Sequence, residues 1–178
     1  MKVLVFGGSQ GAHAINVAMV EAAPRLAAAG IALAFTHQTG ERDVELVRDE
    51  YRRAGLQARV EPFLYAMDRE MTIADLVISR AGATTLAEIT AAGRPSILVP
   101  YPLATDDHQR KNAEVLAAVG AAEVIDQASL TGAALADRIS ALARDPVRRR
   151  HMAAAARGLA RPEAARTIVE RALALASA

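Results

Sequence analysis

The chain has 178 residues, a length typical of one domain, and 52% of them are hydrophobic, which is enough to build a core. Its formal net charge is only +1 and 3% of its residues are aromatic, so it lacks the basic surface and the stacking side chains that nucleic-acid-binding proteins use. The absence of cysteine excludes disulfides, zinc–thiolate sites and thiol nucleophiles. No apolar run approaches the roughly 18 residues of a membrane span and no signal peptide precedes the first strand, which predicts a cytosolic protein.

Short apolar runs alternate with helical patterns along the whole chain. We expect strands at residues 1–6, 31–36, 58–62, 76–78, 97–99 and 122–125. We expect helices at residues 12–29 and 41–54, a short one ending near 74, and others at 84–93, 106–120, 131–144, from 146 onward and at 163–176. The first strand is apolar at consecutive positions, as in a parallel sheet that is buried on both faces. The pattern therefore predicts one doubly wound, Rossmann-like α/β domain over residues 1–178, with about six mostly parallel strands and helices on both faces.

Polar side chains gather where the fourth and fifth predicted strands lead into helices. Because ligands bind at the carboxyl ends of parallel strands, these turns are candidate binding sites. The hydroxyls of Thr84 and Thr85 lie at a helix N-terminus, which favours anions, and Glu88 follows one turn later on the same face. This arrangement fits a phosphate followed by the hydroxyl pair of a sugar. Gln109 and Asn112 form a similar co-facial pair on the next helix.

Two of these features have a structural alternative. Thr85 and Glu88 have the spacing of a capping box, in which the pair only closes the helix N-terminus. Asp106 and Gln109 have the same spacing. Three donor-rich turns at one edge of a sheet favour a shared ligand site over three separate caps.

The turn after the first strand has the sequence GGSQGA. It matches neither G-x-G-x-x-G nor a P-loop, and it is compatible with a simple tight turn. If the turn binds a ligand, Ser9 and the N–H groups near Gly11 would hold a phosphate.

Other polar and apolar residues at this edge have two interpretations each. Phe63, Leu64 and Met67 follow the third strand and could pack in the core or form a slot for a flat base. Arg80 follows a buried strand and could form a salt bridge at the edge of the core or serve the site. His108 is a candidate general base only because of its proximity to the site.

Other catalytic patterns are missing from the sequence. There is no Asp-x-Asp motif for a metal-bound diphosphate, no readable Ser/His/Asp set and no ligand spacing among His13, His37 and His151, so we expect no metal and no cofactor. The basic cluster at residues 148–150 fits a solvated helix face or, alternatively, a contact with anionic lipid.

Four motifs follow one another along the chain: GGSQGAHAIN, PF-x-x-x-M, SRAGATTLAEI-x-AAG-x-P and PYPLATDDHQ-x-x-NA. In this order and spacing they resemble the C-terminal half of the bacterial N-acetylglucosaminyltransferases of peptidoglycan synthesis, the MurG family. The resemblance covers the whole chain. It implies one half of a two-domain GT-B fold, in which the C-terminal domain binds UDP-N-acetylglucosamine. The N-terminal domain of that family binds a lipid-linked muramyl-pentapeptide, lipid I, at the cytoplasmic face of the membrane.

The resemblance also implies a role for each matching residue. Phe63 and Leu64 would frame the uracil with Met67 nearby, and Glu88 would accept hydrogen bonds from the ribose. Ser9, Ala83, Thr84 and Thr85 would surround the diphosphate at helix N-termini, and Arg80 would support the nucleotide pocket. Gln109 and Asn112, with His108 beside them, would address the sugar hydroxyls. The implied substrate-binding residues are Ser9, Gln10, Gly11, Phe63, Leu64, Met67, Arg80, Gly82, Ala83, Thr84, Thr85, Glu88, His108, Gln109 and Asn112.

The family's N-terminal acceptor domain has no counterpart in this sequence. We therefore expect a donor-binding half that is inactive alone. It carries no catalytic residue apart from the weak candidate His108. Two alternatives are a transferase completed in trans by a separate acceptor-binding chain, and half of another GT-B nucleotide-sugar enzyme such as a UDP-sugar epimerase. The expected partners are UDP or UDP-N-acetylglucosamine, the missing domain with its lipid I acceptor, and a second copy bound through the exposed interdomain face. The full-length enzyme would be peripheral on the inner membrane.

Overall fold

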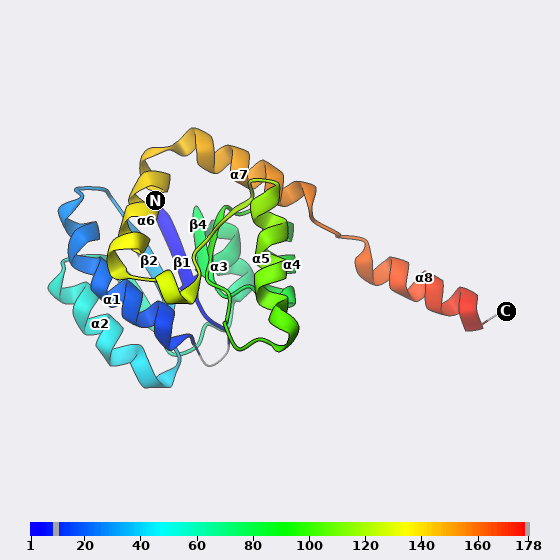
Figure 1. Cartoon of the computed structure of the whole chain (residues 1–178), viewed down its shortest axis with the longest axis horizontal. Helices are drawn as coiled ribbons and strands as arrows, with labels where there is room; N and C mark the ends of the chain where they lie inside the picture. Colours follow the sequence, from blue (N-terminus) through cyan, green and yellow to red (C-terminus); the bar gives the residue numbers. More distant parts are fainter. Residues whose placement is uncertain (9–10, 177–178) are drawn as a thin grey trace.

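A computed structural model describes residues 1–8 and 11–176, and Figure 1 shows them as one layered α/β body with a terminal helix extending from it. The six strands form one parallel sheet in the order β3-β2-β1-β4-β5-β6. The strands are β1 (Lys2–Phe6), β2 (Ala34–Gln38), β3 (Gln57–Glu61), β4 (Leu76–Ser79), β5 (Ser96–Leu98) and β6 (Ala122–Val124). The predicted doubly wound, Rossmann-like fold is therefore confirmed.

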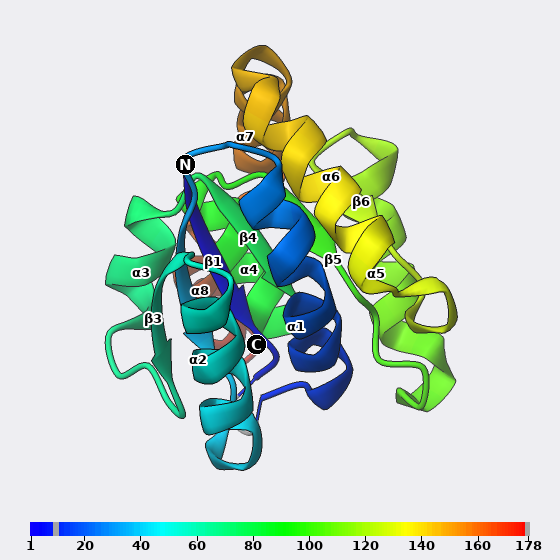
Figure 2. The ribbon, with the colours of Figure 1, turned by 90° about the vertical axis from the view of Figure 1, so that its left-hand side faces the viewer.

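Helices cover both faces of the sheet (Figure 2). One face is covered by α1 (His13–Ala28), α2 (Val44–Arg53) and α6 (Gly132–Arg144), and the other by α3 (Met67–Ile73), α4 (Ala83–Ala92) and α5 (His108–Ala118). Helix α7 (Pro146–Gly158) contacts both α6 and α4, and α8 (Ala164–Ala176) follows it. Short 3-10 turns, η1 (Glu41–Asp43), η2 (Thr105–Asp107) and η3 (Gln127–Ser129), precede α2, α5 and α6.

Strand β1 lies in the middle of the sheet, and the sheet separates the hydrophobic core into two parts. Val3 and Val5 point into the core on the α1 side, whereas Leu4 and Phe6 point into the core on the α4 side. Each of these side chains is at most 4% exposed, and burying a side chain of this size contributes roughly 1.5–3 kcal/mol. Burial on both faces explains why the strand is apolar at consecutive positions.

Several predicted boundaries differ from the observed ones, most clearly at β2 and α5. Strand β2 begins at Ala34 instead of residue 31, because Ala34 pairs with Lys2 and residues 31–33 have no strand beside them. It continues to Gln38, since His37 and Gln38 are buried although both are polar. The helix expected near residue 106 begins at His108, after Asp106 and Asp107 adopt positive φ angles of 50° and 54°.

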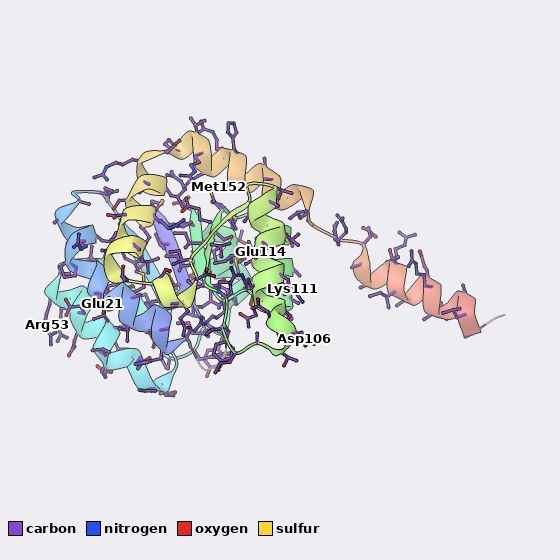
Figure 3. All side chains as sticks on the ribbon, viewed as in Figure 1. Glu21, Arg53, Asp106, Lys111, Glu114 and Met152 are labelled. Atoms are coloured by element: carbon purple, nitrogen blue, oxygen red, sulfur yellow. The ribbon has the colours of Figure 1, made fainter. Side chains whose placement is uncertain are left out.

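Helix α8 extends away from the body (Figure 1), and its side chains project all round it (Figure 3). Every residue of α8 is exposed, and its apolar side chains include Ile168 at 66% and Val169 at 56%. The basic cluster at residues 148–150, which precedes α8 in the chain, forms contacts within the body. Arg148 pairs with Glu123 at 2.8 Å and Arg149 donates to backbone carbonyls at the end of α6. None of the described helices is long and apolar enough to cross a membrane.

Close packing of α6 on α1 predicts a strong effect at Gly132. A Cβ atom at this position would lie 2.3 Å from the Glu21 Cβ and 2.7 Å from the backbone nitrogen of Ala22 (Glu21 is labelled in Figure 3). We expect Gly132→Ala to lower the free energy of unfolding by about 1–3 kcal/mol in urea titrations, because α6 must move. The control is Gly158→Ala, where the added Cβ meets nothing within 4 Å and should be neutral or stabilising. Equal stability of the two variants would contradict this account.

Candidate functional site

A cavity of about 570 Å³, named here the main cavity, opens at the carboxyl edge of the sheet. The loops that follow β1, β4, β5 and β6 all contribute to it, so segments far apart in the sequence meet at one place. It is lined by Gly7, Gly8, Gly11, Ala12, His13, Ala14, Arg80, Gly82, Thr85, Tyr101, Gln109 and Gln127. None of these described lining residues is acidic, so the cavity suits an anion.

Two helices begin at the cavity without a capping side chain. The N-cap residues of α1 and α4 are Ala12 and Gly82, and neither accepts a side-chain bond from its own first turn. The N-caps of α2, α3 and α5 also lack a side-chain bond, whereas α6 and α7 are capped by Thr131 and Asp145. The first-turn N–H groups of α1 and α4 therefore remain available, and together with the helix dipoles they favour an anion.

The loop after β1 has room for backbone alone at Gly11. Gly11 donates its N–H to the Gly8 carbonyl at 3.0 Å, which closes the turn, and its φ is +75°. A Cβ atom at Gly11 would lie 1.8 Å from the carbonyl oxygen of Thr39. Glycine is required here because the turn packs directly against the end of β2.

Arg80 places a positive charge in the cavity. One of its terminal nitrogens, Nη1, donates to the carbonyls of Val99 and Pro100 at 3.1 Å, and the other, Nη2, donates to Gln127 Oε1 at 2.6 Å. Its guanidinium also lies 5.4 Å from the centroid of the Tyr101 ring. Burial lowers the pKa of Arg80, with Tyr101 opposing the effect, but a guanidinium remains charged at neutral pH. No carboxylate in the described structure pairs with it, so the salt bridge considered from the sequence is not formed.

Gln109 and Asn112 join two loops at this edge. The Oε1 atom of Gln109 accepts from the Ala81 N–H at 3.2 Å and the Tyr101 N–H at 3.0 Å, and Asn112 Nδ2 donates to the Ala81 carbonyl at 3.2 Å. The predicted co-facial pair therefore meets at Ala81. The alternative in which Gln109 caps its own helix with Asp106 is wrong, because α5 begins only at His108 and its N-cap has no side-chain bond.

Gln38 makes a similar link that sequence reasoning missed. Its Nε2 donates to the Gly8 carbonyl at 2.7 Å, and its Oε1 accepts from the Leu64 N–H at 2.9 Å. The side chain is only 2% exposed and connects the loop after β1 to the loop after β3. The only signal in the sequence was a polar side chain two residues beyond the predicted end of the second strand.

The predicted base and ribose residues lie outside the lining of the main cavity. Phe63 is 42% exposed and stacks edge-on against Tyr65 with centroids 5.0 Å apart, whereas Leu64 is buried in the core. Met67 and Glu88 line a second hollow of about 340 Å³ between α3 and α4. Glu88 is exposed, and the capping box considered for it is not formed, because α4 begins at Ala83.

The structure thus divides the predicted site residues into groups. Those that line the main cavity are Gly11, Arg80, Gly82, Thr85 and Gln109. Those outside its lining are Phe63, Leu64, Met67, Ala83, Thr84, Glu88, His108 and Asn112, of which the exposed His108 donates from Nδ1 to the Thr105 carbonyl at 2.7 Å. Ser9 and Gln10 lie outside the described residues. No described cluster of three or more His, Cys, Asp or Glu side chains is placed to hold a metal.

A buried polar network behind the first turn was also missed. Asn16 Nδ2 donates to the Thr39 carbonyl at 2.9 Å and to Asp43 Oδ2 at 2.8 Å, so its Oδ1 must accept from His37 Nε2 at 3.0 Å. His37 Nδ1 then accepts from the Tyr51 hydroxyl at 3.0 Å. Burial lowers the pKa of His37 to about 3, against the opposing charge of Asp43, and burial raises the pKa of Tyr51 well above its usual range. Both groups are therefore neutral.

Comparison with known proteins assigns the class. Residues 2–168 match the family model described as the glycosyltransferase family 28 C-terminal domain, and the chain belongs to this family.

Individual relatives narrow the assignment. Over 169 residues the chain is 50% identical to the UDP-N-acetylglucosamine–N-acetylmuramyl-(pentapeptide) pyrophosphoryl-undecaprenol N-acetylglucosamine transferase of Anaeromyxobacter sp., and over 168 residues it is 51% identical to that of Geobacter metallireducens. These matches cover 95% and 94% of this chain but 44% and 46% of the relatives, so the chain spans about half their length. The resemblance inferred from the motifs is thereby confirmed.

Solved structures agree with this assignment. The crystal structure of Acinetobacter baumannii MurG matches with a TM-score of 0.84 and 36% identity, over 96% of this chain and 51% of that one. The spinosyn forosaminyltransferase SpnP matches with a TM-score of 0.71 at 23% identity, over 99% of this chain and 44% of that one, which shows a shared fold alone.

The neutral His37 predicts how stability depends on pH. Its pKa is about 3 in the folded state and near 6.5 when unfolded, so its contribution is complete above pH 6.5 and is lost as the pH falls towards 3. Between about pH 6.5 and 4.5 we expect the free energy of unfolding to fall by up to about 1.4 kcal/mol per pH unit in denaturant titrations. The folded-state pKa of Asp43 is lowered, so its contribution is lost only under more acidic conditions.

His37→Gln removes the titrating ring and should flatten the profile in this window. NMR of the folded wild type provides an independent check, since the His37 ring should not titrate above about pH 4. Parallel stability profiles for wild type and variant would show that another group controls the dependence.

Proposed function

We propose that this chain is the donor-binding domain of a glycosyltransferase that moves N-acetylglucosamine from UDP-N-acetylglucosamine to a lipid-linked muramyl-pentapeptide. The observation that carries the proposal is the main cavity, where Arg80 without a carboxylate partner faces the uncapped N-termini of α1 and α4. A diphosphate is the anion that such a cavity suits, because it can accept from both helices and from the guanidinium. The names of the relatives supply the donor and the acceptor.

The same groups would assist the chemistry. When the bond between the anomeric carbon and the diphosphate oxygen breaks, negative charge accumulates on the departing UDP. The first turns of α1 and α4 and Arg80 already line the cavity, so their donors would be in place to stabilise that charge. The attacking hydroxyl belongs to the acceptor, which we place on the part of the protein outside this chain. We therefore propose that the isolated domain binds the donor without transferring its sugar.

The nucleoside would lie next to the main cavity, towards α3. Glu88 is exposed between α3 and α4 and would accept hydrogen bonds from the ribose hydroxyls. Phe63 and Met67, at the start of the same region, would contact the uracil. The Leu64 N–H is engaged by Gln38, so in this arrangement its carbonyl would be the group that reads the base.

We propose that the exposed stripe on α8 packs against the remainder of the longer protein. Ile168, Val169 and Leu173 are each more than half exposed, which is a large apolar surface for one helix. The undecaprenol in the relatives' names supports a place for the longer protein at a membrane surface. Without the remainder, the same stripe would pair two copies of this chain. Sedimentation of the chain and of Ile168→Lys should then show a dimer only for the wild type, and a monomeric wild type would exclude the pairing.

Calorimetric titration with UDP-N-acetylglucosamine, UDP and uridine tests the donor site. We expect both diphosphates to bind and uridine to bind more weakly, because it lacks the anion. Absence of binding by both diphosphates at millimolar concentration would refute the proposed function.

Glu88→Gln tests the ribose contact. We expect affinity for UDP to fall by about 1–3 kcal/mol, since the amide that replaces the carboxylate is uncharged and has one accepting oxygen instead of two. The melting temperature should not change, because no cap on α4 depends on Glu88. The control is Glu114→Gln on the exposed face of α5 (Figure 3), which should alter neither quantity. A fall in melting temperature with unchanged affinity would assign Glu88 to helix stability instead.

A further inference from the structure

We propose that His13 supplies a second positive charge to the main cavity, present only when its imidazole is protonated, and that this charge contacts the diphosphate of the donor. The inference rests on the proposed function and adds a pH-dependent binding residue to that site. His13 is the first residue of α1, lines the cavity together with Arg80, and its side chain is 50% exposed.

Asp43 determines which ring nitrogen of His13 is free. His13 Nδ1 lies 2.9 Å from Asp43 Oδ2 and 3.1 Å from Oδ1. An ionised carboxylate only accepts hydrogen bonds, so Nδ1 carries a hydrogen and donates it. The second nitrogen, Nε2, then donates to a ligand in the imidazolium form, but presents a lone pair in the neutral form. Protonation therefore changes both the charge and the hydrogen-bonding character of the group offered to an anion.

The carboxylate of Asp43 is itself held in place. Asp43 is 4% exposed, and its Oδ2 atom accepts a hydrogen bond from Asn16 Nδ2 at 2.8 Å. Arg42 Nε lies 3.8 Å from Asp43 Oδ1. Burial raises the pKa of Asp43, but the hydrogen bonds from Asn16 and His13 and the charges of His13 and Arg42 outweigh it, so the pKa is lowered. Because Asn16 is also tied to His37, the buried network fixes the orientation of the imidazole at the mouth of the turn.

Four charged or titratable groups of the described residues lie around His13. They are Asp43 and Arg42 in the segment before α2, Arg80 in the loop after β4 and Tyr101 in the loop after β5. The described lining of the cavity contains no carboxylate that would compete with a ligand for the imidazolium. A bound diphosphate would therefore lie between two cations at low pH and beside one at high pH.

The test is the affinity of the full chain for UDP-N-acetylglucosamine, measured at several pH values between about pH 5.5 and 8.5. The diphosphate of this ligand is ionised throughout that range. We expect wild-type affinity to fall roughly tenfold as the pH rises, the effect of losing one charge-assisted hydrogen bond. His13→Gln should bind at the weaker level at every pH, whereas His13→Arg should keep the stronger level without pH dependence. His151→Gln, exposed on α7, is the control and should behave as wild type.

Asp43→Asn tests whether Asp43 acts on binding through the charge of His13, because a merely structural role would not change the pH dependence of affinity. Loss of the carboxylate disfavours the imidazolium, so the midpoint of the pH dependence should move to lower pH. If the wild type binds no uridine diphosphate at all, the proposed function fails. If the wild type binds and His13→Gln retains both its affinity and its pH dependence, this inference alone is overturned.

Discussion

The candidate site depends on the register of the parallel sheet. Phe6 at the end of β1 pairs with Gln38 and Ser79, and the pairing continues through Leu98 to Val124 on the far strands. The strands therefore end in one line, and the loops that follow start at the same level. A shift of one strand by a single residue would reverse the facing of its side chains and move its loop away from the others. Backbone pairing thus assembles a cavity from segments that are distant in the sequence.

Side-chain amides hold the loops at this edge of the sheet together. Gln38 links the loops after β1 and β3, and Gln109 links those after β4 and β5, each through backbone groups. Backbone partners leave the sequence of these loops free to vary while their spacing is maintained. Behind them, Asn16 uses both of its N–H groups and its carbonyl, so the adjacent His37 must carry a hydrogen on Nε2, while burial keeps its ring neutral.

Most of the fold could be predicted from the sequence, because β1 is apolar at consecutive positions and glycines mark the helix ends. The location of the turns at one sheet edge could also be predicted, since parallel topology places them there. Helix starts were less accessible: Thr85 and Glu88 have the spacing of a capping box, yet α4 begins earlier at Ala83. Buried polar residues such as Gln38 were missed, because composition does not reveal which polar side chains find partners only after folding.

The uncapped helices have a thermodynamic consequence. An Ala at the N-cap costs a helix about 0.5–2 kcal/mol and a Gly only about a few tenths, so α1 with Ala12 carries the larger deficit and α4 with Gly82 the smaller one where they meet the cavity. A diphosphate bound there would serve as the cap of both helices, so ligand recognition and the completion of secondary structure would be the same event. Ligand at a hundredfold excess over its Kd adds about 2.7 kcal/mol to folding stability. The empty domain is thus built to be less stable than the occupied one.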